Sequence, residues 1–110
     1  MNVISLEDLK AKLDRGDKFK LIMTLNEWAF NAKHIPGSIN ISRMEDAARL
    51  PDPEEEIIVY CSDPACIASQ AAYQYLVKRG FKHVHRFSGG LMEWDAAGYP
   101  LEGESAYSIV

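Results

Sequence analysis

Apolar and polar residues follow two different spacings along the chain. Between Ser5 and Gly16, three leucines recur at helical spacing, whereas residues 19–25, FKLIMTL, are almost continuously apolar. The first pattern predicts an amphipathic helix capped by Ser5 and stopped by Gly16. The second predicts a strand that is largely buried.

The same two patterns continue to the end of the chain. They predict further helices over residues 26–33, 42–50, 67–80 and 89–98, and further strands over residues 34–42, 56–61 and 83–88. Asn26 is expected to cap one of these helices, and Ser42 with Glu45 to open another as a capping box. This alternation of helices and strands predicts an α/β domain with a mostly parallel sheet.

Length and composition narrow the class of protein. The 110 residues suit one domain, 1–110, and the 47% apolar and 25% charged content is ordinary for a globular protein. The net charge of −4 and the lack of a basic run argue against nucleic-acid binding. The start of the chain is unlike a signal peptide, and no apolar run is long enough to span a membrane. We therefore expect a cytoplasmic protein that uses neither nucleic acid nor membrane.

Both cysteines of the chain lie in one short stretch, residues 58–69, IVYCSDPACIAS. Cys61 ends a predicted strand and is followed by a tight loop and a helix. Ligands of open α/β sheets bind at the carboxyl ends of strands, and helix N-termini favour anions. A thiolate is stabilised in such a place, so Cys61 is a candidate nucleophile, with a buried structural cysteine as the alternative.

Two further motifs flank this stretch, AKHIPGSINI at 32–41 and RFSGGLMEWDAAGYPLEG at 86–103. Together with IIVYC and the helix after it, they resemble the signatures of single-domain rhodaneses, sulfurtransferases that carry sulfur as a cysteine persulfide. The resemblance spans about 3–103 and leaves 104–110 as a C-terminal tail. It implies a rhodanese-like domain with helices on both faces of a central sheet.

The resemblance also implies a function and a site. Cys61 would accept sulfur from thiosulfate or from a small-molecule or protein persulfide donor, and would pass it to a thiophilic acceptor. Neither a cofactor nor a metal is expected, since the three histidines lie on other elements than the cysteines. The substrate anion and the persulfide would be held by the backbone N–H groups of a loop comprising Ser62, Asp63, Pro64, Ala65, Cys66, Ile67 and Ala68.

The chain departs from the family pattern in ways that bear on the donor. Typical members have a shorter loop that ends in a basic residue, whereas residues 61–77 here contain no Lys or Arg and Asp63 adds a negative charge. Anion binding would then depend on backbone donors, so a persulfide donor is as credible as thiosulfate. Either Arg43 or Arg86 could reach the loop in place of the missing cation. Ile67 stands where phosphatases and arsenate reductases of this fold carry an arginine, which argues against those activities.

Cys66 admits several roles. It could resolve a Cys61 persulfide by forming a disulfide, accept the sulfur and relay it, or pack between helix and sheet as a small apolar residue. A thiol–disulfide or persulfide-sensing module using Cys61 and Cys66 is therefore an alternative function. A non-catalytic binding domain on the same fold is another. The sequence specifies neither the oligomeric state nor whether the chain is part of a longer protein.

Overall fold

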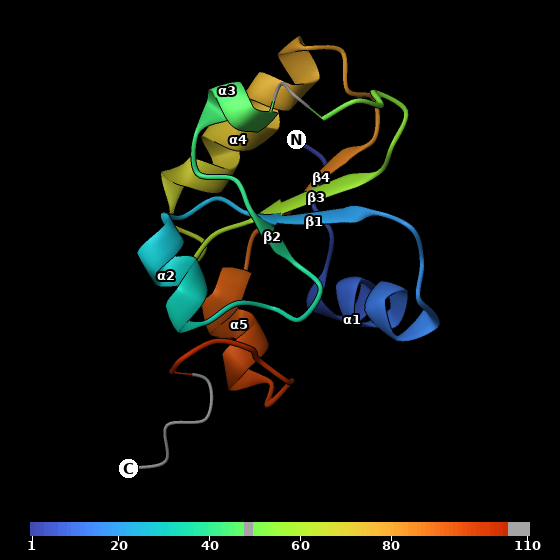
Figure 1. Ribbon diagram of the computed structural model, residues 1–110. Helices are drawn as coiled ribbons and strands as arrows, with labels where there is room; N and C mark the ends of the chain where they lie inside the picture. The colour runs from blue at the N-terminus through green and yellow to red at the C-terminus, as the bar shows by residue number, and fades with distance from the viewer. Residues whose placement is uncertain (48–49, 106–110) are drawn as a thin grey trace.

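The computed structural model describes residues 1–47 and 50–105, and the helices and strands follow one another as predicted. In chain order the elements are α1 (Leu6–Arg15), β1 (Lys20–Met23), α2 (Glu27–Ala32), β2 (Ile39–Asn40), α3 (Met44–Ala47), β3 (Ile57–Tyr60), α4 (Ile67–Lys78), β4 (Val84–Phe87) and α5 (Gly90–Ala96). Figure 1 shows the strands side by side at the centre, with helices around them.

The four strands form one parallel sheet in the order β2-β1-β3-β4. In its register, Met23 of β1 lies opposite Tyr60 of β3, and Tyr60 lies opposite Phe87 of β4. All four residues of β3 are buried, which agrees with its continuous apolar run. The predicted α/β class with a parallel sheet is confirmed. Each strand ends at the same edge of the sheet, and Cys61 follows β3 at that edge.

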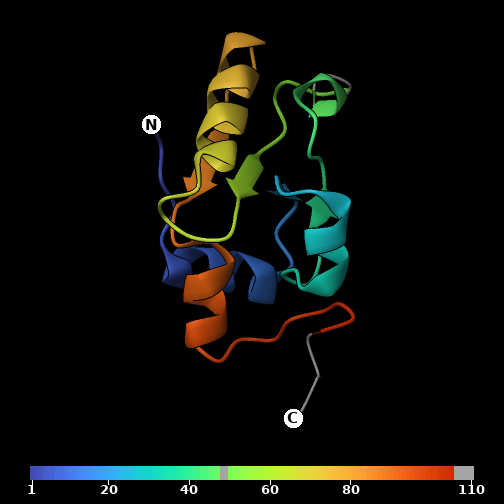
Figure 2. The same ribbon diagram turned by 90° about the vertical axis from the view of Figure 1, so that its left-hand side faces the viewer.

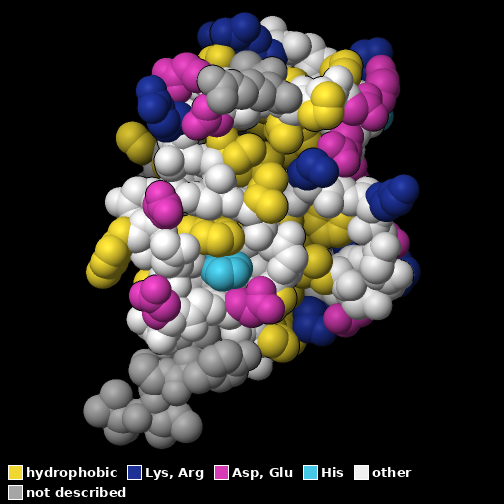
Figure 3. All heavy atoms as spheres, viewed as in Figure 1, with side chains coloured by type: hydrophobic (Ala, Val, Ile, Leu, Met, Phe, Trp, Pro, Cys, Tyr) yellow, Lys and Arg dark blue, Asp and Glu magenta, His cyan; other side chains and the backbone are white. Residues whose placement is uncertain are grey.

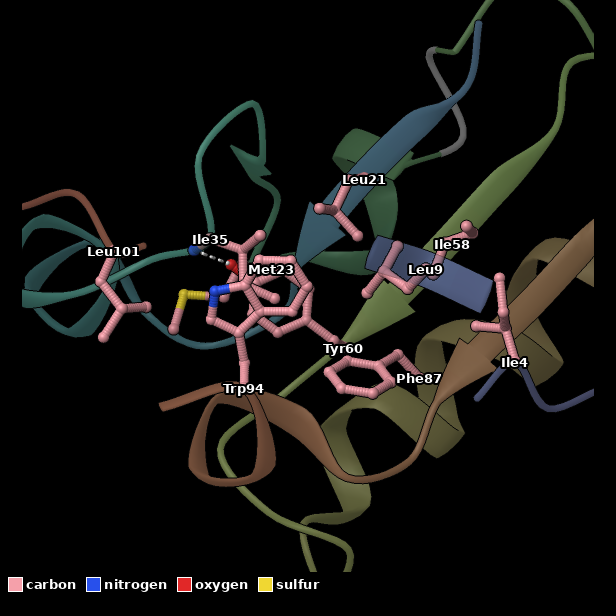
Figure 4. Packing of buried hydrophobic residues seen from close by; sticks show 10 residues of the cluster. All are labelled: Ile4, Leu9, Leu21, Met23, Ile35, Ile58, Tyr60, Phe87, Trp94 and Leu101. Carbon is pink, nitrogen blue, oxygen red and sulfur yellow. Dashed lines mark hydrogen bonds between the residues drawn. The ribbon is translucent and has the colours of Figure 1, made fainter. Parts of the chain in front are cut away.

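Helices cover both faces of the sheet, and each face has its own hydrophobic core. Leu9 of α1 and Trp94 of α5 belong to one core, whereas Ala72 and Leu76 of α4 belong to the other. Figure 2 shows α4 on one side of the strands and α1 with α5 on the opposite side. Figure 4 shows the first core, in which aromatic and aliphatic side chains from the strands and helices interlock.

One polar group inside the first core is fully satisfied. The Tyr60 hydroxyl accepts a hydrogen bond from the Ile35 amide at 3.0 Å, drawn in Figure 4, and lies 2.9 Å from Ser38 Oγ. Burial raises the pKa of Tyr60 to about 12, although the hydrogen bonds oppose this shift. The hydroxyl therefore ties the segment between α2 and β2 to the centre of the sheet.

The predicted helix caps form at two of three positions. Ser5 Oγ accepts from the Asp8 amide at 3.1 Å, and Asn26 Oδ1 accepts from the Ala29 amide at 2.8 Å. The third prediction is wrong, because α3 begins at Met44, two residues after Ser42, and Leu50 is not helical. Here the Arg43 carbonyl accepts the first helical bonds. Residues 48 and 49 of that predicted helix lie outside the described residues.

The strands are shorter than the apolar runs that predicted them. Of the run 34–42, only Ile39–Asn40 pairs with β1, since the Pro-Gly turn occupies its first half. The segment after α5 returns to α2, where Glu102 and His34 exchange backbone hydrogen bonds of 2.9 Å. Of the predicted tail 104–110, Glu104 continues this contact with the Asn31 carbonyl, while residues 106–110 lie outside the described part.

Charged side chains of both signs are interspersed on the face drawn in Figure 3. This distribution agrees with the absence of a basic run in the sequence. Within residues 1–47 and 50–105, every helix is too short or too polar to cross a bilayer.

Candidate active site

Cys61 lies at the carboxyl end of β3, directly before the loop that leads into α4. Its side chain is buried, with 1% of the residue exposed. Cys66 is the N-cap of α4 and is half-buried. Of the predicted loop 62–68, residues 62–66 connect the strand to the helix, and Ile67 with Ala68 already belong to the first turn of α4.

The two cysteines are joined by a disulfide in this structure. Their Cα atoms are 6.2 Å apart, a normal separation for cysteines linked in this way. Cys66 is thus directed across the loop toward Cys61 rather than into the interface between helix and sheet. The structure describes the oxidised chain, and reduction would release two thiols in direct contact.

Helix α5 holds the first two carbonyl groups of the loop. The Leu91 amide donates to the Cys61 carbonyl at 2.9 Å, and the Met92 amide donates to the Ser62 carbonyl at 2.8 Å. This approach requires glycine at position 90, whose φ is +65°. A Cβ atom there would lie 2.6 Å from the Cys61 carbonyl oxygen and 2.9 Å from the Ser62 carbonyl carbon.

Arg86 of β4 holds two more carbonyl groups from the other side. Its guanidinium donates to the Pro64 carbonyl at 3.2 Å and to the Cys66 carbonyl at 3.4 Å, and its Nε donates to Ser69 Oγ at 2.9 Å. Only 6% of the residue is exposed. Arg86 therefore does reach the loop, but it supports the backbone from within the protein and does not stand at the surface as a cation for substrate.

These carbonyl contacts orient the amide groups of the loop. In a trans peptide the N–H of the next residue points away from the carbonyl, and none of the described peptides is cis. The N–H groups of Ser62 and Asp63 therefore point away from α5, and that of Ile67 points away from Arg86. Among the described residues these three amides have no hydrogen-bond acceptor. They are oriented donors available to an anion.

The remaining amides of the loop stabilise its shape. Asp63 accepts twice, from the Ala65 amide through Oδ1 at 2.9 Å and from the Cys66 amide through its carbonyl at 3.1 Å. This Asx turn fixes the chain direction between the two cysteines. Asp63 therefore stabilises the loop, although its negative charge disfavours the binding of an anionic substrate.

A surface pocket of about 280 Å³ adjoins the loop. It is lined by Lys33, Ser62, Asp63, Leu91, Met92 and Asp95. Lys33 Nζ lies 3.9 Å from Asp95 Oδ2, so the single cation of this lining is shared with a carboxylate. The pocket carries one positive and two negative side chains beside the first residues of the loop.

Residues of the two flanking motifs, 32–41 and 86–103, have supporting positions. Trp94 is buried and donates from its indole N–H to the Pro100 carbonyl at 2.7 Å. His34 stacks on Phe30 and has Nδ1 2.8 Å from the Phe30 carbonyl oxygen. Arg43 is exposed, with its Nε 3.8 Å from Glu45 Oε2, and in the described part of the chain it makes no hydrogen bond or ion pair to residues 61–68. No cluster of three potential metal ligands occurs in the part of the chain that the structure describes.

Sequence reasoning missed two features of the site. Lys33 lies inside the motif at 32–41, but nothing in the sequence indicates that the end of α2 reaches the loop. The supporting role of Arg86 did leave a signal, because alternation along β4 puts it on the same face as Val84, toward α4. A charged residue on a strand covered on both faces must find polar partners, and the loop carbonyls are those partners.

Comparisons with known proteins identify the family of the chain. The model of the rhodanese-like domain family matches residues 5–97. The chain is 37% identical over 71 residues to a thiosulfate sulfurtransferase, GlpE, from Pseudoalteromonas translucida, a match covering 63% of this chain and 66% of that protein. It is 35% identical over 75 residues to an HTH-type transcriptional regulator from Mycobacterium tuberculosis, covering 66% of this chain and 33% of the regulator.

Solved structures extend the likeness to nearly the whole chain. The rhodanese-like domain of an Anabaena protein superimposes with a TM-score of 0.86 at 26% identity, covering 99% of this chain and 84% of that one. A Bacillus halodurans protein gives a TM-score of 0.89 at 25% identity, covering 99% and 82%. The match to each of the two curated relatives spans less than two thirds of that relative's own length. On the family model and these structures together, the chain belongs to the rhodanese-like domain family.

Proposed function

We propose that this chain is a sulfurtransferase that carries sulfane sulfur as a persulfide on Cys61. The donor is thiosulfate or a small-molecule or protein persulfide, and the acceptor is a thiophile such as a thiolate. The similarity of the chain to GlpE thiosulfate sulfurtransferases supports this class of reaction. The chemistry requires Cys61 in its reduced form, so we expect the protein to act where thiols are kept reduced, as in the cytoplasm.

The proposal rests chiefly on the backbone of the loop. Its carbonyl groups are engaged from outside by α5 and by Arg86, which leaves the N–H groups of Ser62, Asp63 and Ile67 oriented the other way. Oriented amides, together with the N-terminus of the twelve-residue helix α4, stabilise a thiolate and the terminal sulfur anion of a persulfide.

The reaction divides into two displacements at sulfur. The Cys61 thiolate attacks the outer sulfur of the donor, forming an S–S bond and expelling sulfite from thiosulfate or a thiolate from a persulfide. The acceptor then attacks the outer sulfur of the Cys61 persulfide, which returns the Cys61 thiolate. Covalent catalysis of this kind predicts ping-pong kinetics.

The charges around the loop favour one class of donor. With Asp63 and Asp95 beside Lys33, the adjoining pocket repels a dianion more than it repels a singly charged or neutral group. We therefore propose a persulfide as the better donor, and thiosulfate as a slower one. This preference should weaken as salt is added, because the carboxylates are partly exposed and screened by ions.

The test is sulfur loading of the reduced protein, followed by intact-protein mass spectrometry and peptide mapping. Cys61→Ser should abolish both the gain of sulfur and the transfer to an acceptor thiol, whereas Cys66→Ser, the matched control in the same loop, should still load. Full transfer by Cys61→Ser would contradict the proposal. If Cys61 gains sulfur from neither donor, the result would support the alternative function of a non-catalytic binding domain.

A further inference from the structure

The second cysteine is held in position to react with the first. Cys66 Sγ contacts Cys61 Sγ directly in the disulfide, across a loop of four intervening residues. The backbone of Cys66 is fixed at both ends, since its amide donates to the Asp63 carbonyl and its own carbonyl accepts from Arg86. The contact between the sulfurs therefore requires no displacement of β3 or α4.

The surroundings of Cys66 suit a nucleophile. It is the N-cap of α4, a helix of twelve residues with no acidic side chain in its first turn. Its side chain makes no capping hydrogen bond, so its sulfur is not occupied by the helix it precedes. The partial positive charge of the helix N-terminus favours the thiolate, which is the attacking form of cysteine.

We infer that Cys66 is a catalytic resolving thiol, which reduces the Cys61 persulfide and makes the protein a sulfide-releasing persulfide reductase. This inference rests on the proposed function, because it needs the persulfide on Cys61. The Cys66 thiolate attacks Sγ of Cys61, and the bond between Sγ and the outer sulfur breaks. The proton that the Cys66 thiol loses passes to the outer sulfur, which leaves as hydrosulfide. The sulfane sulfur is reduced by two electrons, and the two cysteines are oxidised to the disulfide.

The position of Cys66 favours the inner sulfur, Cys61 Sγ, as the atom that is attacked. The disulfide present in the structure joins Cys66 to Sγ of Cys61, which is the bond that attack on the inner sulfur forms. Attack on the outer sulfur would instead move the persulfide to Cys66 and leave no disulfide. The geometry thus favours resolution over relay.

A second turnover needs an external dithiol. Cys66 is half-buried whereas Cys61 is 1% exposed, so the dithiol attacks Cys66 Sγ and expels the Cys61 thiolate. The second thiol of the reductant then displaces Cys66 from the mixed disulfide, and both cysteines are again reduced. A monothiol also forms a mixed disulfide with Cys66, but a second monothiol molecule must then react to release Cys66.

The experiment is a single turnover with the full chain, reduced and freed of reductant. Wild type, Cys66→Ser, Cys66→Ala and Cys61→Ser each receive one equivalent of glutathione persulfide or thiosulfate. Sulfide is measured over time, and each chain is analysed by intact mass and peptide mapping. Serine and alanine differ in polarity, so if one Cys66 variant fails to fold, the other can still be tested. Urea denaturation measures whether each variant is folded.

We expect wild type to release about one sulfide per chain and to end as the Cys61–Cys66 disulfide. The Cys66 variants should retain the added sulfur on Cys61 and release sulfide at least tenfold more slowly. Equal sulfide release by wild type and the Cys66 variants would overturn the inference, as would sulfur found on Cys66 of wild type, while the proposed function stands. Failure of the Cys66 variants to gain sulfur on Cys61 would overturn the proposed function and this inference with it.

Discussion

Replacing Gly90 by alanine should damage the active-site loop through its backbone alone. Gly90 has φ of +65°, a left-handed conformation that costs an alanine about 1 kcal/mol. The new Cβ atom would lie 2.6 Å from the Cys61 carbonyl oxygen and 3.0 Å from the Asp63 amide nitrogen, both backbone atoms. Relief of this clash separates α5 from the loop and breaks the bonds from Leu91 and Met92, at about 1 kcal/mol each. We expect a total loss of about 3 kcal/mol in the free energy of unfolding.

Gly98→Ala provides the matched control. Gly98 has φ of +76°, but no atom lies within 4 Å of the position that a Cβ would take there. Its substitution therefore carries the conformational cost of about 1 kcal/mol without the clash. Urea denaturation should place Gly90→Ala about 2 kcal/mol below Gly98→Ala. In a Cys66→Ser background, which retains the added sulfur, the rate of sulfur loading on Cys61 should fall at least tenfold with Gly90→Ala and stay near that of the parent with Gly98→Ala. Equal destabilisation of the two variants would refute the close approach of α5 to the loop.

Substitutions at two further positions, Arg86 and Tyr60, examine a support of the loop and a polar group of the first core. Arg86→Met removes the guanidinium from two loop carbonyls and should slow sulfur loading at least tenfold. Arg86→Lys, which keeps the charge and some donors, should recover part of the rate, and equal rates in both variants would argue against positioning. Tyr60→Phe leaves the Ile35 amide unpaired and should cost about 1–3 kcal/mol in urea denaturation. The raised pKa of Tyr60, about 12 when folded against about 10 when unfolded, leaves stability intact below pH about 10 and lowers it by about 2–3 kcal/mol toward pH about 12. Tyr60→Phe should lose that decline.

Local sequence signals predicted the framework of the fold well. The apolar run before Cys61 is a buried strand, and the caps at Ser5 and Asn26 form as their side chains indicate. These features depend on neighbouring residues, so a single sequence contains the information. The helix expected to begin at Ser42 begins at Met44 instead. A capping pattern expresses only a local preference, so it does not determine where the helix starts.

The supports of the candidate site come from distant parts of the chain. Arg86 bonds to the carbonyl of Cys66, twenty residues before it, and α5 bonds to the carbonyl of Cys61. The spacing of residues along one segment cannot indicate such pairs, because the sheet order and the strand ends bring them together. Gly90 lies within one of the family-like motifs, but the loop backbone that it faces is evident only in three dimensions.

Because α5 and Arg86 hold the loop by its carbonyl groups, the selectivity for donor and acceptor can be altered separately from the chemical step. The proposed anion cradle consists of main-chain amides, so loop side chains that make no structural hydrogen bond can be exchanged without removing the donors. Selectivity for donor and acceptor can then be redesigned at Ser62 or Ala65, or at Lys33 in the adjoining pocket, with the chemical step left to the fixed backbone. Besides Cys61, Asp63 and Cys66, such a library must keep Gly90 and Arg86 constant, and these two residues lie outside the loop they shape.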